Sequence, residues 1–511
     1  MKIILDICKK ILDKEISSED LKSVSTNYNI YPHSITKVEG SILFLAKLDN
    51  VKFLVILEQS PLFTKFEGEL ILDNRGKICP LNYNNSQYLR ETFPFTSPTS
   101  HKGHPITIGL GDRLGLASIG HLRLAKEYKF FPILAQQSIR ELNLTGRTYV
   151  DVLDAASWSV FQEGYKNGFG ADGDHLKTHE EVKMALDCGF TMITLDCSDY
   201  IDNSIYEMDE EQIEQKYSLI EKPVRQVLEK KYLNKAFVIN NNMSLTFNNL
   251  DFKRIVLVYL NTIEHAASIY KELLTPLHDR IDFELSIDET LFTTSIEAHY
   301  FVAAELIDRG VKISSLAPRF CGEFQKGIDY IGDQKQFEEE FTQHFLISGH
   351  FGYKISVHSG SDKFSVFPII GKVTNGNYHL KTAGTNWLEA VRVIALKDPS
   401  LFRDIYDFGA KHLEEAKKYY YIKAQSGDII SLDHILDTNI PALLDDENVR
   451  QILHITYGLI LQNKSEDNKY IFRDRIFELL NTYEEDYSKK LYEHIGKHVE
   501  KLNIEKLADL K

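Results

Sequence analysis

The sequence predicts an α/β protein built around a (β/α)8 barrel of the TIM type. Three observations lead to this prediction. Between residues 104 and 400, short apolar segments with strand character alternate with helical segments. The alternation gives eight strand–helix units, which favours a closed barrel over an open, doubly wound sheet. The chain also has 511 residues, too many for a single ordinary domain.

Residues 1–103 are expected to form an N-terminal β-rich module. The segments "SILFLAKL", "VKFLVILEQ" and "FEGELILD" have the composition of strands, and Asp49-Asn50 and Ser60-Pro61 separate them. The turn residues from Asp73 to Gly76 close the last of these segments. We therefore expect a β-meander followed by a polar connection to the barrel.

Residues 104–400 supply the expected barrel. Helical segments such as "GHLRLAKEY", "THEEVKMALDCG" and "SIEAHYFVAAELIDRG" lie between its strands. Residues 200–255 interrupt the rhythm and predict a largely helical insertion, and the charged residues 401–511 predict a helical C-terminal extension. The strand segments are "ITIGL", "FFPILA", "FGAD", "MITLD", "FELSID", "KISSLAP", "YKISVH" and "YHLKTAG".

Composition excludes several classes of protein. The net charge of −15 argues against a general nucleic-acid binder, which needs a basic face. The five cysteines are scattered, with no CxxC pair, so neither a disulfide framework nor a thiolate zinc site is expected. The N-terminal apolar run carries charges too early for a signal peptide, and no apolar run is long enough to cross a bilayer. We expect a cytoplasmic protein that binds neither nucleic acid nor membrane, and the sequence leaves open whether it forms a homo-oligomer.

The strand ends carry the chemistry of the expected barrel. In this fold the active site forms at the carboxyl ends of the strands, and six of the eight ends carry an acid. In "FGADGDHLKTHEEV", Thr178 and Glu181 form a capping-box pattern, which places Asp174 and His175 between the strand and the following helix. Histidine and carboxylate ligands from several strands suit Zn, Mn, Ni or Fe(II). The sequence therefore predicts a divalent metal cation as the cofactor.

Four long segments identify a family. "GLGDRLGLASIGH", "DAASWSVFQEGYKNGFGADGDHLK", "LAPRFCGEFQKGIDYIGD" and "ISVHSGSDKFSVFP" resemble the tagaturonate epimerase family. The resemblance runs from about residue 104 to about residue 415. It implies a metal-dependent isomerase of bacterial hexuronate catabolism, an epimerase that interconverts D-tagaturonate and D-fructuronate by inversion at the fourth carbon.

The resemblance also implies roles for residues. A metal bound by His175 is implied, with Asp174 as the base beside it and Glu284 as the proton donor. Asp288 and Glu289 on the same strand end compete with Glu284 for the donor role. Glu323 and His358 are expected to be the remaining metal ligands. Arg319 is the first choice for pairing the substrate carboxylate. The full set of expected substrate-binding residues is Asp112, Arg113, Lys177, Arg319, Asp362 and Lys363.

Two alternatives to this function remain open at the level of sequence. A metal-dependent aldolase or isomerase for another ketose or sugar acid would have a similar barrel and similar ligands. A sugar-acid sensor that has lost turnover would need only the binding residues, whereas an epimerase needs an acid and a base. The mechanism is open as well. The fourth carbon is β to the ketone, so its hydrogen is not acidified by simple enolisation, and either retro-aldol cleavage or an unusually stabilised carbanion would be required.

Overall fold

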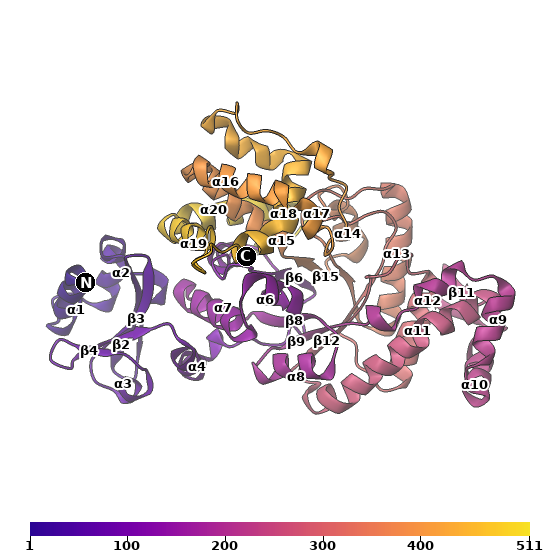
Figure 1. The fold of residues 1–511 in the computed structure, drawn as a ribbon. Helices are drawn as coiled ribbons and strands as arrows, with labels where there is room; N and C mark the ends of the chain where they lie inside the picture. Colours follow the sequence, from indigo (N-terminus) through magenta and orange to yellow (C-terminus); the bar gives the residue numbers. More distant parts are fainter. Residues whose placement is uncertain (511) are drawn as a thin grey trace.

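The computed structural model describes residues 1–510 and confirms the predicted barrel (Figure 1). Eight parallel strands close in the order β12-β13-β14-β15-β6-β7-β8-β9. Each coincides with one of the eight segments expected from the sequence. They are β6 (Ile106–Leu110), β7 (Phe131–Ser138), β8 (Gly170–Leu176), β9 (Met192–Asp196), β12 (Asp282–Ile287), β13 (Ser315–Pro318), β14 (Lys354–Val357) and β15 (Tyr378–Thr382).

The barrel interior is unusually polar. Alternation along a strand sends successive side chains to opposite faces. In β12 and β15 this places Glu284 and Lys381 inside, where they form an ion pair, while Leu285 and Leu380 pack into the apolar core around the barrel. Most TIM barrels fill this interior with branched apolar side chains. Here the strands bring charged groups together instead.

Helices surround the barrel, and an insertion extends it on one side (Figure 1). The region between β9 and β12 begins with α9 and α10 and ends with the long α11, as the predicted helical insertion requires, but it also contains the antiparallel pair β10–β11. The barrel helices are α5 (Ser118–Ala125), α6 (Ile139–Thr145), α7 (Tyr149–Glu163), α8 (His179–Asp187), α11 (Asn249–Ile269), α12 (Ile296–Asp308), α13 (Gln334–Phe351), α14 (Phe367–Thr374) and α15 (Gly384–Lys397). The insertion contains α9 (Glu210–Ser218), α10 (Lys222–Tyr232), β10 (Ala236–Asn240) and β11 (Met243–Thr246).

The N-terminal module differs from the expected meander in one respect. Its five strands pair antiparallel in the order β1-β2-β3-β5-β4, so β5 lies between β3 and β4. The segment expected as the third strand forms only the short β4 at the edge, where Glu69 and Leu70 are exposed. The elements are α1 (Lys2–Leu12), α2 (Ser18–Val24), β1 (Thr36–Val38), β2 (Ser41–Leu48), β3 (Val51–Leu57), α3 (Pro61–Lys65), β4 (Glu69–Ile71), β5 (Gly76–Pro80) and α4 (Tyr83–Thr92).

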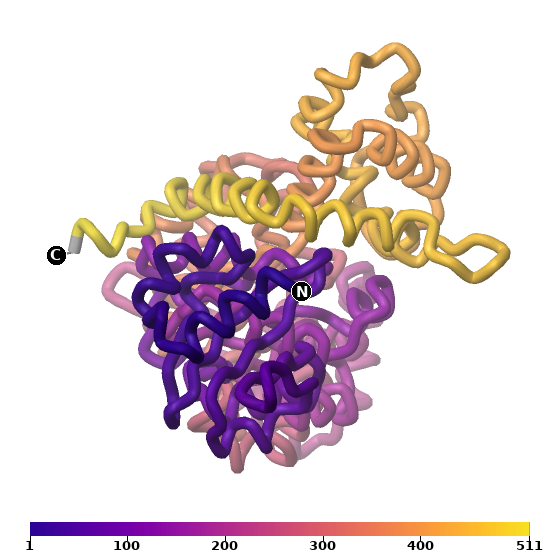
Figure 2. The backbone as a smooth tube through the Cα atoms, turned by 90° about the vertical axis from the view of Figure 1, so that its left-hand side faces the viewer, coloured from indigo at the N-terminus to yellow at the C-terminus, as the bar shows by residue number. Residues whose placement is uncertain are grey.

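The C-terminal region is helical, as predicted, and covers one side of the barrel (Figure 1). Figure 2 shows its last helix, α20, running across the molecule. A side chain at Gly120 of α5 would meet the Ser488 carbonyl of α20 at 2.7 Å, so glycine permits this close approach. No helix within residues 1–510 is long and apolar enough to span a bilayer. The helices are α16 (Pro399–Lys411), α17 (Leu413–Ala416), α18 (Glu447–Gln462), α19 (Arg473–Thr482) and α20 (Glu484–Lys501).

A buried ionic network joins the C-terminal helices to the barrel. Asp362, which follows β14, accepts hydrogen bonds from Arg450 of α18 at 2.7 Å and from His494 of α20 at 2.5 Å. His494 also faces Glu389 at 3.1 Å, and burial opposes its charge, but Asp362 raises its pKa to about 9. His498 completes the group, but its Nε2 already accepts the Asp362 backbone N–H. These pairings make the cluster a structural network, with no free nitrogen for a metal.

We expect Asp362→Asn to destabilise the protein. The change removes the negative charge that Arg450 pairs with and leaves His494 with Glu389 alone. Loss of one member of a buried pair costs about 3–5 kcal/mol. Urea unfolding followed by circular dichroism measures the difference. The matched control is Asp467→Asn, at an exposed position between α18 and α19, which should stay within about 0.5 kcal/mol of the parent. Equal stabilities for the two variants would show that the network does not hold the region.

Candidate active site

A cavity of about 650 Å³ opens at the carboxyl ends of the barrel strands. This is the end at which TIM barrels carry their active sites. Asp174, Lys381 and His358 reach it from β8, β15 and the loop after β14. Tyr420 and His454 of the C-terminal region also line it. The cavity therefore has walls from two parts of the chain.

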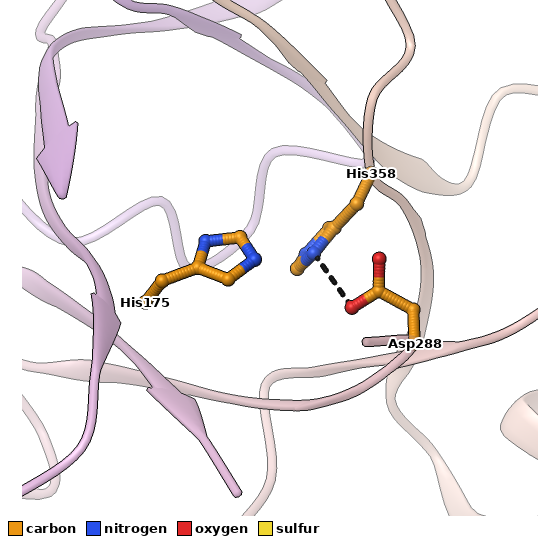
Figure 3. Close-up of side chains that lie close together, drawn as sticks. All are labelled: His175, Asp288 and His358. Atoms are coloured by element: carbon orange, nitrogen blue, oxygen red, sulfur yellow. Dashed lines mark ion pairs between the residues drawn. The ribbon is translucent and has the colours of Figure 1, made fainter. Parts of the chain in front are cut away.

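Three side chains of the cavity wall converge on one another, and we call this part of the wall the floor (Figure 3). His175, Asp288 and His358 each offer a ligand atom within 4.8 Å of the others. His358 Nδ1 lies 3.2 Å from Asp288 Oδ1, and the two imidazole ring centres are 5.0 Å apart. His175 sits in β8 at φ 51°, next to an irregularity in strand pairing, a conformation uncommon for a residue other than glycine. The local bend aims the ring at its two partners.

Each histidine is oriented by a carboxylate. His175 Nδ1 lies 2.7 Å from Asp174 Oδ1, and His358 Nε2 lies 2.7 Å from Glu284 Oε1. The carboxylates accept these hydrogen bonds, which leaves the lone pairs of His175 Nε2 and His358 Nδ1 for the centre of the group. His358 Nδ1 is buried, and the Asp288 carboxylate at 3.2 Å is the neighbour it faces there. Metal-ligating histidines have this carboxylate partner, so the donor set fits a divalent transition metal.

Excess negative charge surrounds the group. Lys381 Nζ lies 2.8 Å from Asp172, 2.6 Å from Asp174 and 3.0 Å from Glu284, so one ammonium serves three carboxylates. Burial opposes ionisation of Asp174, but Lys381 and His175 outweigh it and hold its pKa well below the usual value. Burial raises the pKa of Asp172 to about 6. Burial also opposes charge on His175, yet Asp174 raises its pKa to about 10. The field that attracts a proton to His175 also attracts a cation.

The predicted ligands and catalytic residues lie close together. His175, Glu323 and His358 all line the cavity, but Glu323 lies outside the converging group and instead accepts a hydrogen bond from Gln325. Asp174 also lines the cavity. Glu284 lies fully buried, between Lys381 and His358, and is not part of the cavity wall.

The predicted substrate-binding residues divide into two sets. Arg113, Arg319 and Lys363 line the cavity. The other three lie outside its wall and have local partners. Asp112 accepts hydrogen bonds from backbone N–H groups of its own loop, Lys177 pairs with Asp199 at 2.6 Å, and Asp362 belongs to the network with Arg450.

The structure adds residues that the sequence had not assigned to the metal or the substrate. Lys381 had a signal, because strand alternation in "YHLKT" points it into the barrel with His379. Asp288 was considered only as a competing proton donor. Lys326 and His454 line the cavity from a loop and from α18. No periodicity in the sequence connects those positions to the barrel, so only the tertiary structure reveals them.

Comparisons with known proteins agree with this architecture. A family model described as tagaturonate epimerase matches residues 31–502. The tagaturonate/fructuronate epimerase of Thermotoga maritima is 40% identical over 481 residues, which cover 93% of this chain and 97% of that protein.

Solved structures give the same result. A glycerol complex of the fructuronate-tagaturonate epimerase UxaE from Cohnella laeviribosi is 46% identical, with a TM-score of 0.92 over 95% of this chain and 98% of that one. The native structure of the same enzyme is 45% identical, with a TM-score of 0.92 over 96% and 100% of the two chains. The eight-stranded barrel, the converging side chains and these matches lead to one conclusion: the chain belongs to the tagaturonate epimerase family.

Proposed function

We propose that the protein interconverts D-tagaturonate and D-fructuronate by inversion at the fourth carbon, with a divalent metal held by His175, Asp288 and His358. The observation that carries this proposal is the convergence of two carboxylate-oriented histidines and Asp288 in a cavity at the barrel mouth. Three protein ligands leave positions open for substrate oxygens. The names of the relatives support the choice of substrate. Metal analysis of the purified protein will decide among Zn, Mn, Ni and Fe(II).

Two carboxylates flank His175 and are placed to move protons. Asp174 meets the Nδ1 edge of the ring, and Glu289 lies 3.8 Å from Nε2. Both line the cavity. We assign Asp174 as the base, through Oδ2, because Oδ1 contacts His175 and Lys381 while Oδ2 accepts only a long hydrogen bond from Gln136 at 3.4 Å. The sequence predicted Glu284 as the proton donor, but its burial between Lys381 and His358 favours a positioning role for it instead. Glu289 is the donor that the geometry favours.

The proposed reaction is retro-aldol cleavage followed by re-addition. A divalent metal, when bound, would polarise the substrate's ketone and adjacent hydroxyl oxygens. Asp174 takes the proton of the 4-hydroxyl, the bond between carbons three and four breaks, and carbon four becomes an aldehyde while carbons one to three form an enediolate. The aldehyde presents its other face, the carbon–carbon bond forms again, and protonated Glu289 gives its proton to the new 4-oxygen. Proton exchange with water then returns Asp174 to the carboxylate and Glu289 to the acid. Before the reaction, Lys381 holds Asp174 in the ionised form that can accept the proton of the 4-hydroxyl.

Metal dependence is tested first by removing one ligand. We expect His358→Ala to lose bound metal and turnover together, because the group keeps only one imidazole. His350→Ala, in the last turn of α13, is the matched control and should keep both. Metal content by mass spectrometry and conversion of tagaturonate to fructuronate are the measurements. In the parent protein, chelation should abolish turnover and Mn²⁺ should restore it. Full turnover of metal-free protein would disprove metal dependence.

The base is tested at saturating metal. Asp174→Asn removes a carboxylate that both contacts the substrate space and orients His175, so metal affinity should weaken about 10–100-fold. With every site filled, turnover should still fall by at least the ~10²–10⁴-fold typical of general base catalysis. Titrating metal while following activity separates the two effects. If activity returns to the parent level at high metal, Asp174 only positions His175.

The route is tested in deuterated water. Retro-aldol cleavage never breaks the bond between carbon four and its hydrogen, so fructuronate formed in D₂O should carry no deuterium at carbon four. A proton-transfer route would exchange that hydrogen with solvent. Proton NMR of the product gives the answer. Deuterium at carbon four, appearing at the rate of epimerisation, would rule out the retro-aldol route and favour a stabilised carbanion.

A further inference from the structure

The cavity has a second end that is rich in positive charge. Arg113, Arg140 and Lys326 line it, and the carboxylates of the wall whose charge acts on them are Glu141 and Glu289. Glu141 is already paired with Arg113 Nε at 3.0 Å. Within residues 1–510, neither Arg140 nor Lys326 forms an ion pair with a carboxylate. Lys326 Nζ instead donates to the Ser359 hydroxyl at 2.9 Å. This end, which we call the basic end (Arg113, Arg140, Lys326 and His454), therefore has two cations without a direct carboxylate partner.

Arg113 is held in place, and its buried Nη1 nitrogen forms no hydrogen bond. Its guanidinium stacks 3.9 Å above the ring centre of Tyr457, and Glu141 fixes its Nε. The side chain is only 3% exposed, yet Nη1 has no hydrogen-bond partner. An unsatisfied buried donor on a charged group costs free energy, so such a group commonly awaits a ligand. A guanidinium fork matches the geometry of a carboxylate.

His454 adds a neutral donor to the same end. It lies on α18, is 1% exposed and has no partner at either ring nitrogen. Burial, together with the charges of Arg113 and Lys326, holds its pKa well below the usual value, so the ring is neutral and one nitrogen carries a hydrogen. A side chain at Gly384 would lie 1.8 Å from the ring, so glycine at the start of α15 makes room for it.

We propose that the basic end binds the carboxylate of the ketohexuronate, with Arg113 Nη1 and His454 as its hydrogen-bond donors. This inference rests on the proposed function and adds the orientation of the substrate. The ketone end lies toward the acidic floor with His175 and Asp288, and the carboxylate lies toward α18. The C-terminal region thereby selects acidic over neutral ketoses.

The residues favoured from the sequence for this task have other partners. Lys363 Nζ donates to the carbonyls of Gln325, Ile328 and Ser361, at 2.8, 2.6 and 2.8 Å, so each of its three hydrogens is used. Arg319 lines the cavity, but its Nη1 donates to the Thr290 carbonyl. Arg113 Nη1 is a fully buried guanidinium nitrogen of the cavity wall that has no hydrogen-bond partner within residues 1–510.

The experiment compares substrates with and without the carboxylate. Arg113→Gln should lower kcat/KM for tagaturonate by about 30-fold or more, the loss expected when a desolvated charge pair is broken. For tagatose, which has a hydroxyl in place of the carboxylate, the change should stay within about threefold. Lys326→Gln is a second variant, at a half-buried position, and should shift the same ratio if Arg113→Gln does not fold. Arg473→Gln, at an arginine that stacks on Tyr470 away from the cavity, is the matched control.

Binding separates this inference from the proposed function. Calorimetry with gluconate and with its neutral counterpart glucitol should show that the parent prefers gluconate and that Arg113→Gln does not. If the parent fails to epimerise tagaturonate, the proposed function is wrong, while the gluconate comparison still tests the basic end. Equal losses for tagaturonate and tagatose would overturn the inference. So would a parent that converts fructose 6-phosphate better than tagaturonate, or loss of acid preference in Arg319→Gln and not in Arg113→Gln.

Discussion

Lys381 binds three carboxylates inside the barrel, and the orientation of both candidate metal-binding histidines depends on two of them. Asp174 holds His175 and Glu284 holds His358, so the position of the ammonium fixes the imidazoles through an intermediate carboxylate. Burying these charges is costly unless each is paired. An apolar residue at position 381 would leave three carboxylates without their shared partner. Stability and activity therefore rest on the same side chain.

The charge distribution of the cavity follows from where its walls come from. The end of β8 and the residues that follow β12 provide an acidic floor, with Asp174, Asp288 and Glu289, which attracts a cation. The loops and α18 provide the basic end, where positive groups exceed carboxylates. A ketohexuronate has one end that coordinates metals well and one that is anionic. The polarity of the cavity matches that of the molecule and would disfavour the reversed orientation.

Much of this arrangement was predictable from sequence. The eight strands follow from the alternation of strand and helix, and the capping box predicted from Thr178 and Glu181 does begin α8. Asp174 and His175, expected between the strand and this helix, lie instead in the last three residues of β8. How deeply each side chain lies in the barrel was not predictable from the sequence. Glu284 lies inside β12 and pairs with Lys381, whereas Asp288, four residues later, directly follows the strand and lines the cavity. Glu323 lies in a loop that no periodicity constrains. His454 is distant in sequence and reaches the cavity only because α18 packs over the barrel.

The place of Lys381 on the last barrel strand has a consequence for how the chain is made on the ribosome. Asp172, Asp174 and Glu284 lie on β8 and β12, which are synthesised long before β15 delivers their counter-ion. Until then, the half-made barrel cannot collapse around these carboxylates without burying unpaired charge, so they favour an open, hydrated intermediate. Closure of the barrel at the β15–β6 seam and neutralisation of its interior become one event. The nascent chain is thereby protected from sealing an incomplete barrel, and the cavity gains its last wall only when α18 follows.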